Sequence, residues 1–198
     1  MPDIHVRQRN GILWLILDRH PRNMLTATML EQLSEALLKA SNKPPRLIVL
    51  TGMGEDAFCA GVDLPADSTP VQRQALLQAA QKIEEWLALI HQQGIPTVAL
   101  VKGAALDAGC ELALLCETVL AREDAEFQLP EEQKRIFSRT LALLPAVISK
   151  QELEHLIKSS ETVKARAAMH LGLVHQVLAP GRFLQDAEEL LAMLMSVA

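Results

Sequence analysis

Two loops in the sequence carry residues that could stabilise negative charge on a substrate oxygen. After an apolar stretch at 96–101, a turn of small residues leads into a helical pattern from about Ala108. A helix N-terminus presents unpaired N–H groups and partial positive charge, and two such donors aimed at a carbonyl oxygen stabilise an oxyanion. An earlier loop contains Ala60 and Gly61, which are small enough to let backbone approach a ligand. Each loop also has a purely structural interpretation. The loop with Ala60 and Gly61 could be an ordinary connection from a strand to a helix, and Asp107 could serve only to cap the helix that follows it.

The spacing of apolar residues predicts the elements that would position these loops. The runs at 46–50 and 96–101 have the length and composition of strands buried on both faces. Strands that alternate with helices indicate an α/β fold with largely parallel strands. The pattern alone leaves open a doubly wound sheet or a spiral of ββα units. The predicted strands are 3–8, 12–18, 46–50, 96–101, 118–121 and 173–177, and the predicted helices are 26–40, 71–91, 108–115, 141–158, 163–170 and 182 to the end.

Composition disfavours several classes of function. Hydrophobic residues make up 49% of the 198 residues, enough for the core of one domain. The formal net charge is -5 with no offsetting Lys/Arg cluster, which argues against a nucleic-acid surface. No apolar run reaches the roughly 18 residues of a membrane span, and the first residues lack the apolar segment of a signal peptide. The three cysteines and six histidines show no metal-ligand spacing. We therefore expect a cytoplasmic protein without a metal site.

Four segments, in order along the chain, resemble the crotonase (enoyl-CoA hydratase/isomerase) superfamily. The first matches a family loop of the form F-x-A-G-x-D-L, and the second a glycine-rich segment some 40–50 residues later. The segments are FCAGVDL at 58–64, VKGAALDAGCELALLCE at 101–117, AEFQLPEE at 125–132 and ETVKARAAMHLGLVHQVL at 161–178. The resemblance implies a spiral of ββα units, with a core over about 1–150 and a shortened C-terminal helical part over about 151–198, in a single domain. The absence of a GxGxxG motif at a helix start disfavours a dinucleotide fold.

The resemblance also assigns roles to individual residues. Val62 and Ala108 would supply the two backbone N–H groups of an oxyanion hole. Glu111 would hold and activate a water molecule, while Glu131 would deliver a proton to the α-carbon. A carboxyl acting as an acid near pH 7 needs a raised pKa, and burial near a second carboxylate raises it. The expected substrate-binding residues are Ala60, Gly61, Asp63, Leu64 and Gly109.

The implied activity is that of a lyase, which adds water to an α,β-unsaturated acyl-CoA thioester or removes it, in fatty acid or aromatic acid metabolism. Coenzyme A would be part of the substrate, and no separate cofactor is expected. The implied assembly is a homotrimer or a dimer of trimers, without nucleic acid or membrane. The nearest alternatives are an enoyl-CoA double-bond isomerase, and a non-catalytic acyl-CoA-binding or assembly subunit.

Several positions depart from the family pattern. Family members usually carry glycine where Asp107 and Ala108 stand, and a carboxylate at 107 would oppose an oxyanion unless it turns away. We expect Asp107 to do so by capping the helix through the N–H of Gly109 or Cys110. The family's glycine-rich stretch after P-E is replaced by residues 133–140, which contain no glycine. Some cyclic dienoyl-CoA hydratases also lack these glycines, and 141–145 shows a faint likeness to them.

Overall fold

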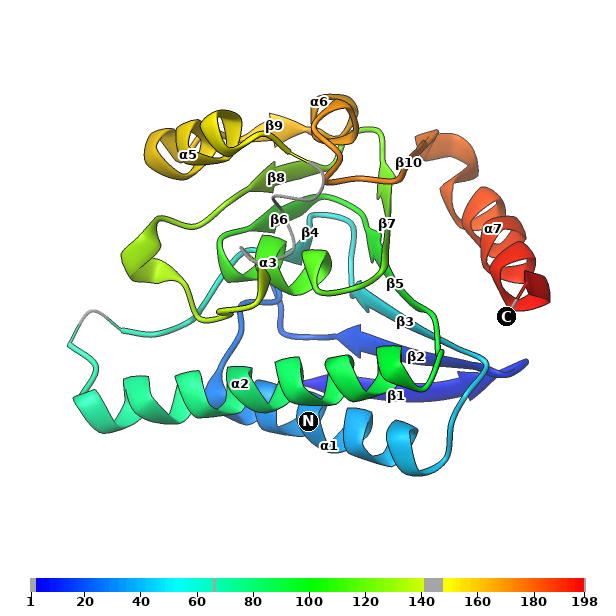
Figure 1. Cartoon of the computed structure of the whole chain (residues 1–198), viewed down its shortest axis with the longest axis horizontal. Coiled ribbons are helices and arrows are strands. Elements are labelled where there is room, and N and C mark those ends of the chain that lie inside the picture. The colour runs from blue at the N-terminus through cyan, green and yellow to red at the C-terminus, as the bar shows by residue number, and fades with distance from the viewer. Residues whose placement is uncertain (1–2, 66, 141–147, 198) are drawn as a thin grey trace.

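The computed structural model describes residues 3–65, 67–140 and 148–197, and its strands form two sheets (Figure 1). The larger sheet has the order β1-β2-β3-β5-β7-β10, and the smaller has the order β4-β6-β8-β9. The larger sheet contains β1 (Ile4–Arg9), β2 (Ile12–Leu17), β3 (Leu47–Gly52), β5 (Thr97–Val101), β7 (Thr118–Arg122) and β10 (Gln176–Leu178). The smaller contains β4 (Ala57–Cys59), β6 (Ala104–Leu106), β8 (Glu126–Gln128) and β9 (Val163–Lys164).

The chain moves repeatedly from the larger sheet to the smaller one. β3 is followed by β4, β5 by β6 and β7 by β8. In the larger sheet β5 pairs in parallel with β3 and β7, and in the smaller sheet β6 pairs in parallel with β4 and β8. A helix follows the first two such pairs, α2 after β4 and α3 after β6. The predicted α/β spiral of ββα units is therefore confirmed. The division into a core and a C-terminal helical part stays a prediction.

Helices cover both faces of the larger sheet. α1 and α2 pack on each other and on one face, where they join the main hydrophobic core. α7 covers the other face, where its Phe183, Ala187 and Leu191 contact buried residues of β2, β3, β5 and β7. The helices are α1 (Ala27–Asn42), α2 (Pro70–Gln92), α3 (Ala108–Leu114), α5 (Lys150–Ser159), α6 (Ala165–His170) and α7 (Phe183–Val197), with short 3-10 turns η1 (Glu132–Lys134) and η3 (Pro180–Arg182).

Most long elements lie where the apolar spacing predicts them. Thr26 begins α1 as expected, because its hydroxyl accepts a hydrogen bond from the N–H of Met29 at 3.1 Å. The predicted strand at 173–177 lies further along, at Gln176–Leu178. Of the helix predicted at 141–158, residues 141–147 lie outside the described residues and α5 accounts for the remainder. The strands β4, β6 and β8 were not predicted, because three residues are too few to display a period of two.

Candidate active site

Two loops meet at one edge of the smaller sheet. β4 and β6 pair in parallel, with Cys59 opposite Ala105, so the backbone that follows each strand emerges at the same edge. A Cβ atom built on Gly61 would lie 3.4 Å from the Cβ of Asp107, and one built on Gly109 would lie 2.1 Å from the carbonyl oxygen of Cys59. The second distance is shorter than any real contact, so only glycine fits at 109. The small residues noted in the sequence thus allow the two loops to touch.

The backbone N–H groups of Val62 and Ala108 lie in these two loops. Neither donates a hydrogen bond to any residue that the structure describes, although the N–H groups of the neighbouring Asp63 and Asp107 do. Ala108 is the first residue of α3, where the N–H has no partner within the helix. Val62 forms an isolated parallel bridge with Leu25, but the two hydrogen bonds of that bridge join Leu25 to the carbonyl of Gly61 and to the N–H of Asp63. Both N–H groups are therefore unpaired among the described residues, which agrees with the assignment to an oxyanion hole. Val62 lines the adjoining cavity, whereas Ala108 is fully buried and does not line it.

A cavity of about 360 Å³ adjoins this edge and is lined by both apolar and charged residues. Among the expected site residues, Val62 and Leu64 line it. Ala60, Gly61 and Gly109 do not line the described cavity, and Asp63 forms an ion pair with Arg19 at 2.5 Å. The lining residues are Val62, Leu64, Pro65, Arg73, Leu76, Leu77, Asp107, Gln133, Lys134, Arg135 and Ile136.

Glu111 lies in α3 with a carboxylate that is 1% exposed. It accepts hydrogen bonds from the Arg135 Nε at 3.1 Å and from the N–H groups of Ile136 and Phe137 at 3.3 and 3.4 Å. Burial raises the pKa of Glu111 to about 7, although these donors oppose the rise. The carboxyl can therefore exchange a proton near neutral pH, which acid–base catalysis requires.

Glu131 is in a different environment from the one we expected. It precedes η1, its side chain is 35% exposed, and it accepts hydrogen bonds from Gln133 and from the Lys134 Nζ at 2.6 Å. The bond with Lys134 lowers the pKa of Glu131. The expected raised pKa is therefore wrong, because the carboxyl is exposed and neutralised by a cation instead of buried beside Glu111. Neither glutamate belongs to the described lining of the cavity.

Asp107 does not cap α3, so that prediction is also wrong. It occupies the position before the helix with φ 48° and ψ −124°, and its side chain makes no capping hydrogen bond. A capping side chain needs an extended backbone at this position, whereas positive φ is easy only for glycine. The family's usual glycine at this position is explained by this backbone.

The carboxyl of Asp107 instead lines the cavity beside Val62. Burial raises the pKa of Asp107, the Lys134 charge lowers it, and the Glu131 charge raises it. An ionised carboxylate at this place would oppose the formation of a nearby oxyanion.

Two buried carboxylates hold the segment that replaces the family's glycine-rich stretch. Glu111 binds its first part, and Glu84 of α2 binds its second part. Glu84 is 4% exposed and accepts from the Ser138 hydroxyl at 2.9 Å and the Arg139 N–H at 2.6 Å. Sequence reasoning missed this role, although Glu84 interrupts the apolar face of α2 between Ala80 and Leu87, three or four residues from each. A charged residue on an apolar helix face was the available signal.

Glu111 should make the protein less stable as pH rises. Its pKa is about 7 in the folded state against an ordinary 4.5, so the folded state binds more protons between these values. The contribution of Glu111 to the free energy of unfolding is then greatest below pH 4.5 and is lost as pH rises through 7, by about 3 kcal/mol. Urea unfolding of the wild type and Glu111→Gln across this range measures it. The free energy of unfolding of the wild type minus that of Glu111→Gln should fall as pH rises. A difference that does not change with pH would contradict the raised pKa of Glu111.

Comparison with known proteins decides the family. The model of the enoyl-CoA hydratase/isomerase family matches residues 7–198. The chain belongs to this family. The Bacillus subtilis protein YngF, named for the same family, is 34% identical over 189 residues, which span 93% of this chain and 72% of YngF. The family is one of enzymes, and the resemblance to the crotonase superfamily is confirmed.

Solved structures agree with the spiral fold. The enoyl-CoA hydratase of Bacillus anthracis superposes with a TM-score of 0.81 at 29% identity, over 98% of this chain and 77% of that one. DspI of Pseudomonas aeruginosa has a TM-score of 0.87 at 24% identity, over 98% and 75%, and shares the fold. The likeness to cyclic dienoyl-CoA hydratases stays a prediction.

None of the helices that the described residues form is both long and apolar enough to cross a membrane. No group of three or more His, Cys, Asp or Glu side chains among the described residues is placed to hold a metal ion.

Proposed function

We propose that this member of the enoyl-CoA hydratase/isomerase family adds water reversibly to an α,β-unsaturated acyl-CoA. The observation that carries the proposal is the pair of unbonded N–H groups, Val62 and Ala108, in touching loops beside a cavity. Addition of water to the β-carbon moves negative charge onto the thioester oxygen. Two fixed donors at that oxygen lower the barrier, because they need no rearrangement as the charge develops. The hydratase name of the Bacillus anthracis neighbour supports the same reaction.

The acid–base steps would fall to Glu111 and Glu131. In the hydration direction, ionised Glu111 accepts a proton from water while the water oxygen bonds to the β-carbon. The resulting enolate then takes a proton at the α-carbon from Glu131, which must first give up its contact with Lys134 and take up a proton from solvent. The proton that Glu111 received from water returns to solvent, so that both carboxyl groups regain their starting states. Arg135 would keep Glu111 ionised for part of the time, because its bond opposes the effect of burial.

The cavity lining suits the two parts of an acyl-CoA. Leu64, Leu76 and Ile136 offer an apolar wall for a short acyl group. Arg73 and Lys134 provide positive charge toward phosphates of coenzyme A. The limited volume of about 360 Å³ favours short acyl chains.

Acyl-CoA binding without catalysis is the second candidate. It is favoured by the Asp107 carboxyl in the cavity and by the pairing of Glu131 with Lys134. Isomerisation of a double bond, a trimer or dimer of trimers, and a cytoplasmic location stay expectations from the family resemblance.

A turnover assay with crotonyl-CoA separates the two candidates. For a hydratase, Glu111→Gln and Glu131→Gln should each lower turnover at least about a hundredfold, the scale of general acid–base catalysis. Binding of the thioester, measured by calorimetry, should change little. Wild-type binding without turnover would favour the non-catalytic subunit, and near wild-type turnover in both variants would refute the roles of the glutamates.

A further inference from the structure

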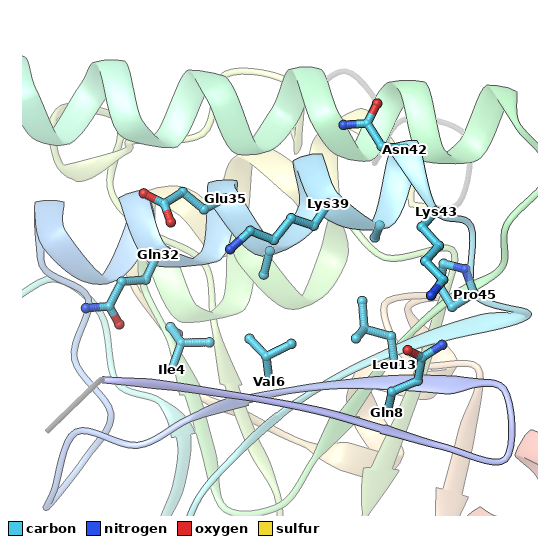
Figure 2. Close-up of a pocket in the computed structure, with 12 residues that line it drawn as sticks. Ile4, Val6, Gln8, Leu13, Gln32, Glu35, Lys39, Asn42, Lys43 and Pro45 are labelled. Atoms are coloured by element: carbon cyan, nitrogen blue, oxygen red, sulfur yellow. The ribbon is translucent and has the colours of Figure 1, made fainter.

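A second cavity lies between the β1–β2 hairpin and α1, and nothing in the proposed reaction uses it (Figure 2). Its volume of about 600 Å³ exceeds that of the candidate active site, and it shares no lining residue with it. It is open to solvent along one side, as a groove. The lining residues are Ile4, Val6, Gln8, Leu13, Gln32, Glu35, Ala36, Lys39, Ala40, Asn42, Lys43 and Pro45.

The groove exists because small residues of α1 face larger ones of the hairpin. Side chains alternate along a strand, so Ile4 and Val6 of β1 point to the same side, toward α1 (Figure 2). Across from them α1 presents Ala36 and Ala40, one helical turn apart. Two methyl groups cannot fill the space, and Val6 remains 53% exposed. An apolar surface of this kind is available to an apolar ligand.

Charge is unevenly distributed along the groove. Lys39 of α1 and Lys43, which caps the end of α1, lie one turn apart on its α1 rim, and no hydrogen bond or ion pair joins either ammonium group to a residue in the described part of the chain. Figure 2 places Lys43 at the end near Gln8 and Pro45, and Glu35 toward the opposite end. Glu35 can offset the charge of Lys39, its neighbour one turn away. The Lys43 end is therefore the cationic one.

We propose that this groove binds the carboxylate of a free medium-chain fatty acid. The alkyl chain would lie along Ile4, Val6 and Leu13, with the carboxylate at the Lys43 end. The five residues from Ile4 to Gln8 span about 13 Å, a length that suits a chain of about ten carbons. The proposal does not depend on the hydration reaction, because the groove and the candidate active site are separate.

Calorimetry on the full chain with decanoate, octanoate and decyltrimethylammonium, all below their micelle concentrations, tests the ligand class. Each buried methylene strengthens binding about fourfold, so decanoate, with two more methylenes, should bind about fifteenfold more tightly than octanoate. Decyltrimethylammonium has an alkyl chain of the same length and the opposite charge, and it should bind at least about tenfold more weakly than decanoate. Equal binding of the cation would overturn the proposal.

Variants then locate the ligand. Lys39→Gln with Lys43→Gln should weaken decanoate binding about tenfold, and Val6→Gln should weaken it by a similar factor. Lys82→Gln on α2 and Leu38→Gln on α1 change exposed residues outside the groove and should leave binding unchanged. The substituted groove side chains are exposed, so melting temperatures should stay close to that of the wild type. If the groove substitutions leave decanoate affinity unchanged, decanoate binds elsewhere on the protein and the proposal is overturned.

Discussion

Replacing Ala108 by proline is expected to lower the turnover of crotonyl-CoA by a factor of about a hundred to a thousand. Proline has no N–H, and the loss of one oxyanion donor costs roughly 3–4 kcal/mol in the barrier. The helix should survive, because Ala108 is the first residue of α3 and proline is favoured at that position. Steady-state kinetics measures the loss.

The matched control is Ala108→Gly, which keeps the N–H and removes only a methyl group. It should retain turnover within a few-fold of the wild type. The melting temperature and thioester affinity of Ala108→Pro show whether the fold and the cavity persist. Full turnover in a folded proline variant would mean that this N–H takes no part in the reaction.

Replacing Asp107 by glycine should increase both activity and stability. Glycine adopts φ 48° and ψ −124° without the strain that a side chain imposes, which should raise the free energy of unfolding by about 1 kcal/mol. Removal of a carboxylate from beside the Val62 loop should raise turnover at pH 8 by about tenfold or more, because a like charge a few ångströms from an oxyanion opposes it. Urea unfolding and crotonyl-CoA kinetics measure the two effects.

Asp107→Asn separates the electrostatic effect from the backbone effect. It removes the charge and keeps the shape, so turnover should rise while stability changes little. Burial raises the pKa of Asp107, and the carboxyl is neutral below that pKa. The ratio of Asp107→Asn turnover to wild-type turnover should therefore grow as pH rises through the pKa of Asp107. An advantage independent of pH would refute the electrostatic cause, and a loss of activity in both variants would show that Asp107 assists the reaction.

The sequence predicted the parts of the fold that depend on long apolar patterns. The buried strands β3 and β5 and the helix α2 are each long enough to show their periodicity, and the ordered motifs supplied the spiral topology. Strands of two or three residues carry no such pattern, so all four strands of the smaller sheet were missed, and β9 was predicted as the start of a helix over 163–170. The pairing of the strands in the smaller sheet depends on how the larger sheet and the surrounding helices position them.

For the candidate site, backbone features were easier to predict than side-chain environments. Small residues near Gly61 indicated a backbone that could approach a ligand, and the family resemblance implied that the two loops share one site. The structure places these loops in contact. The environments of Glu111 and Glu131 depend on Arg135 and Lys134, which lie in a segment unlike that of the family. Motif spacing specifies the position of a carboxyl along the chain and leaves open which cation reaches it.

The attachment of residues 133–140 has a consequence for how substrate preference can change. This wall of the cavity is fixed to α3 by Glu111 and to α2 by Glu84. Glu84 does not line the cavity, yet its carboxylate sets where Arg139 and its neighbours run. A mutation at Glu84 can therefore reshape the acyl pocket without touching an acyl group. Substrate range among relatives of this chain can in this way change through a buried residue that does not line the cavity itself.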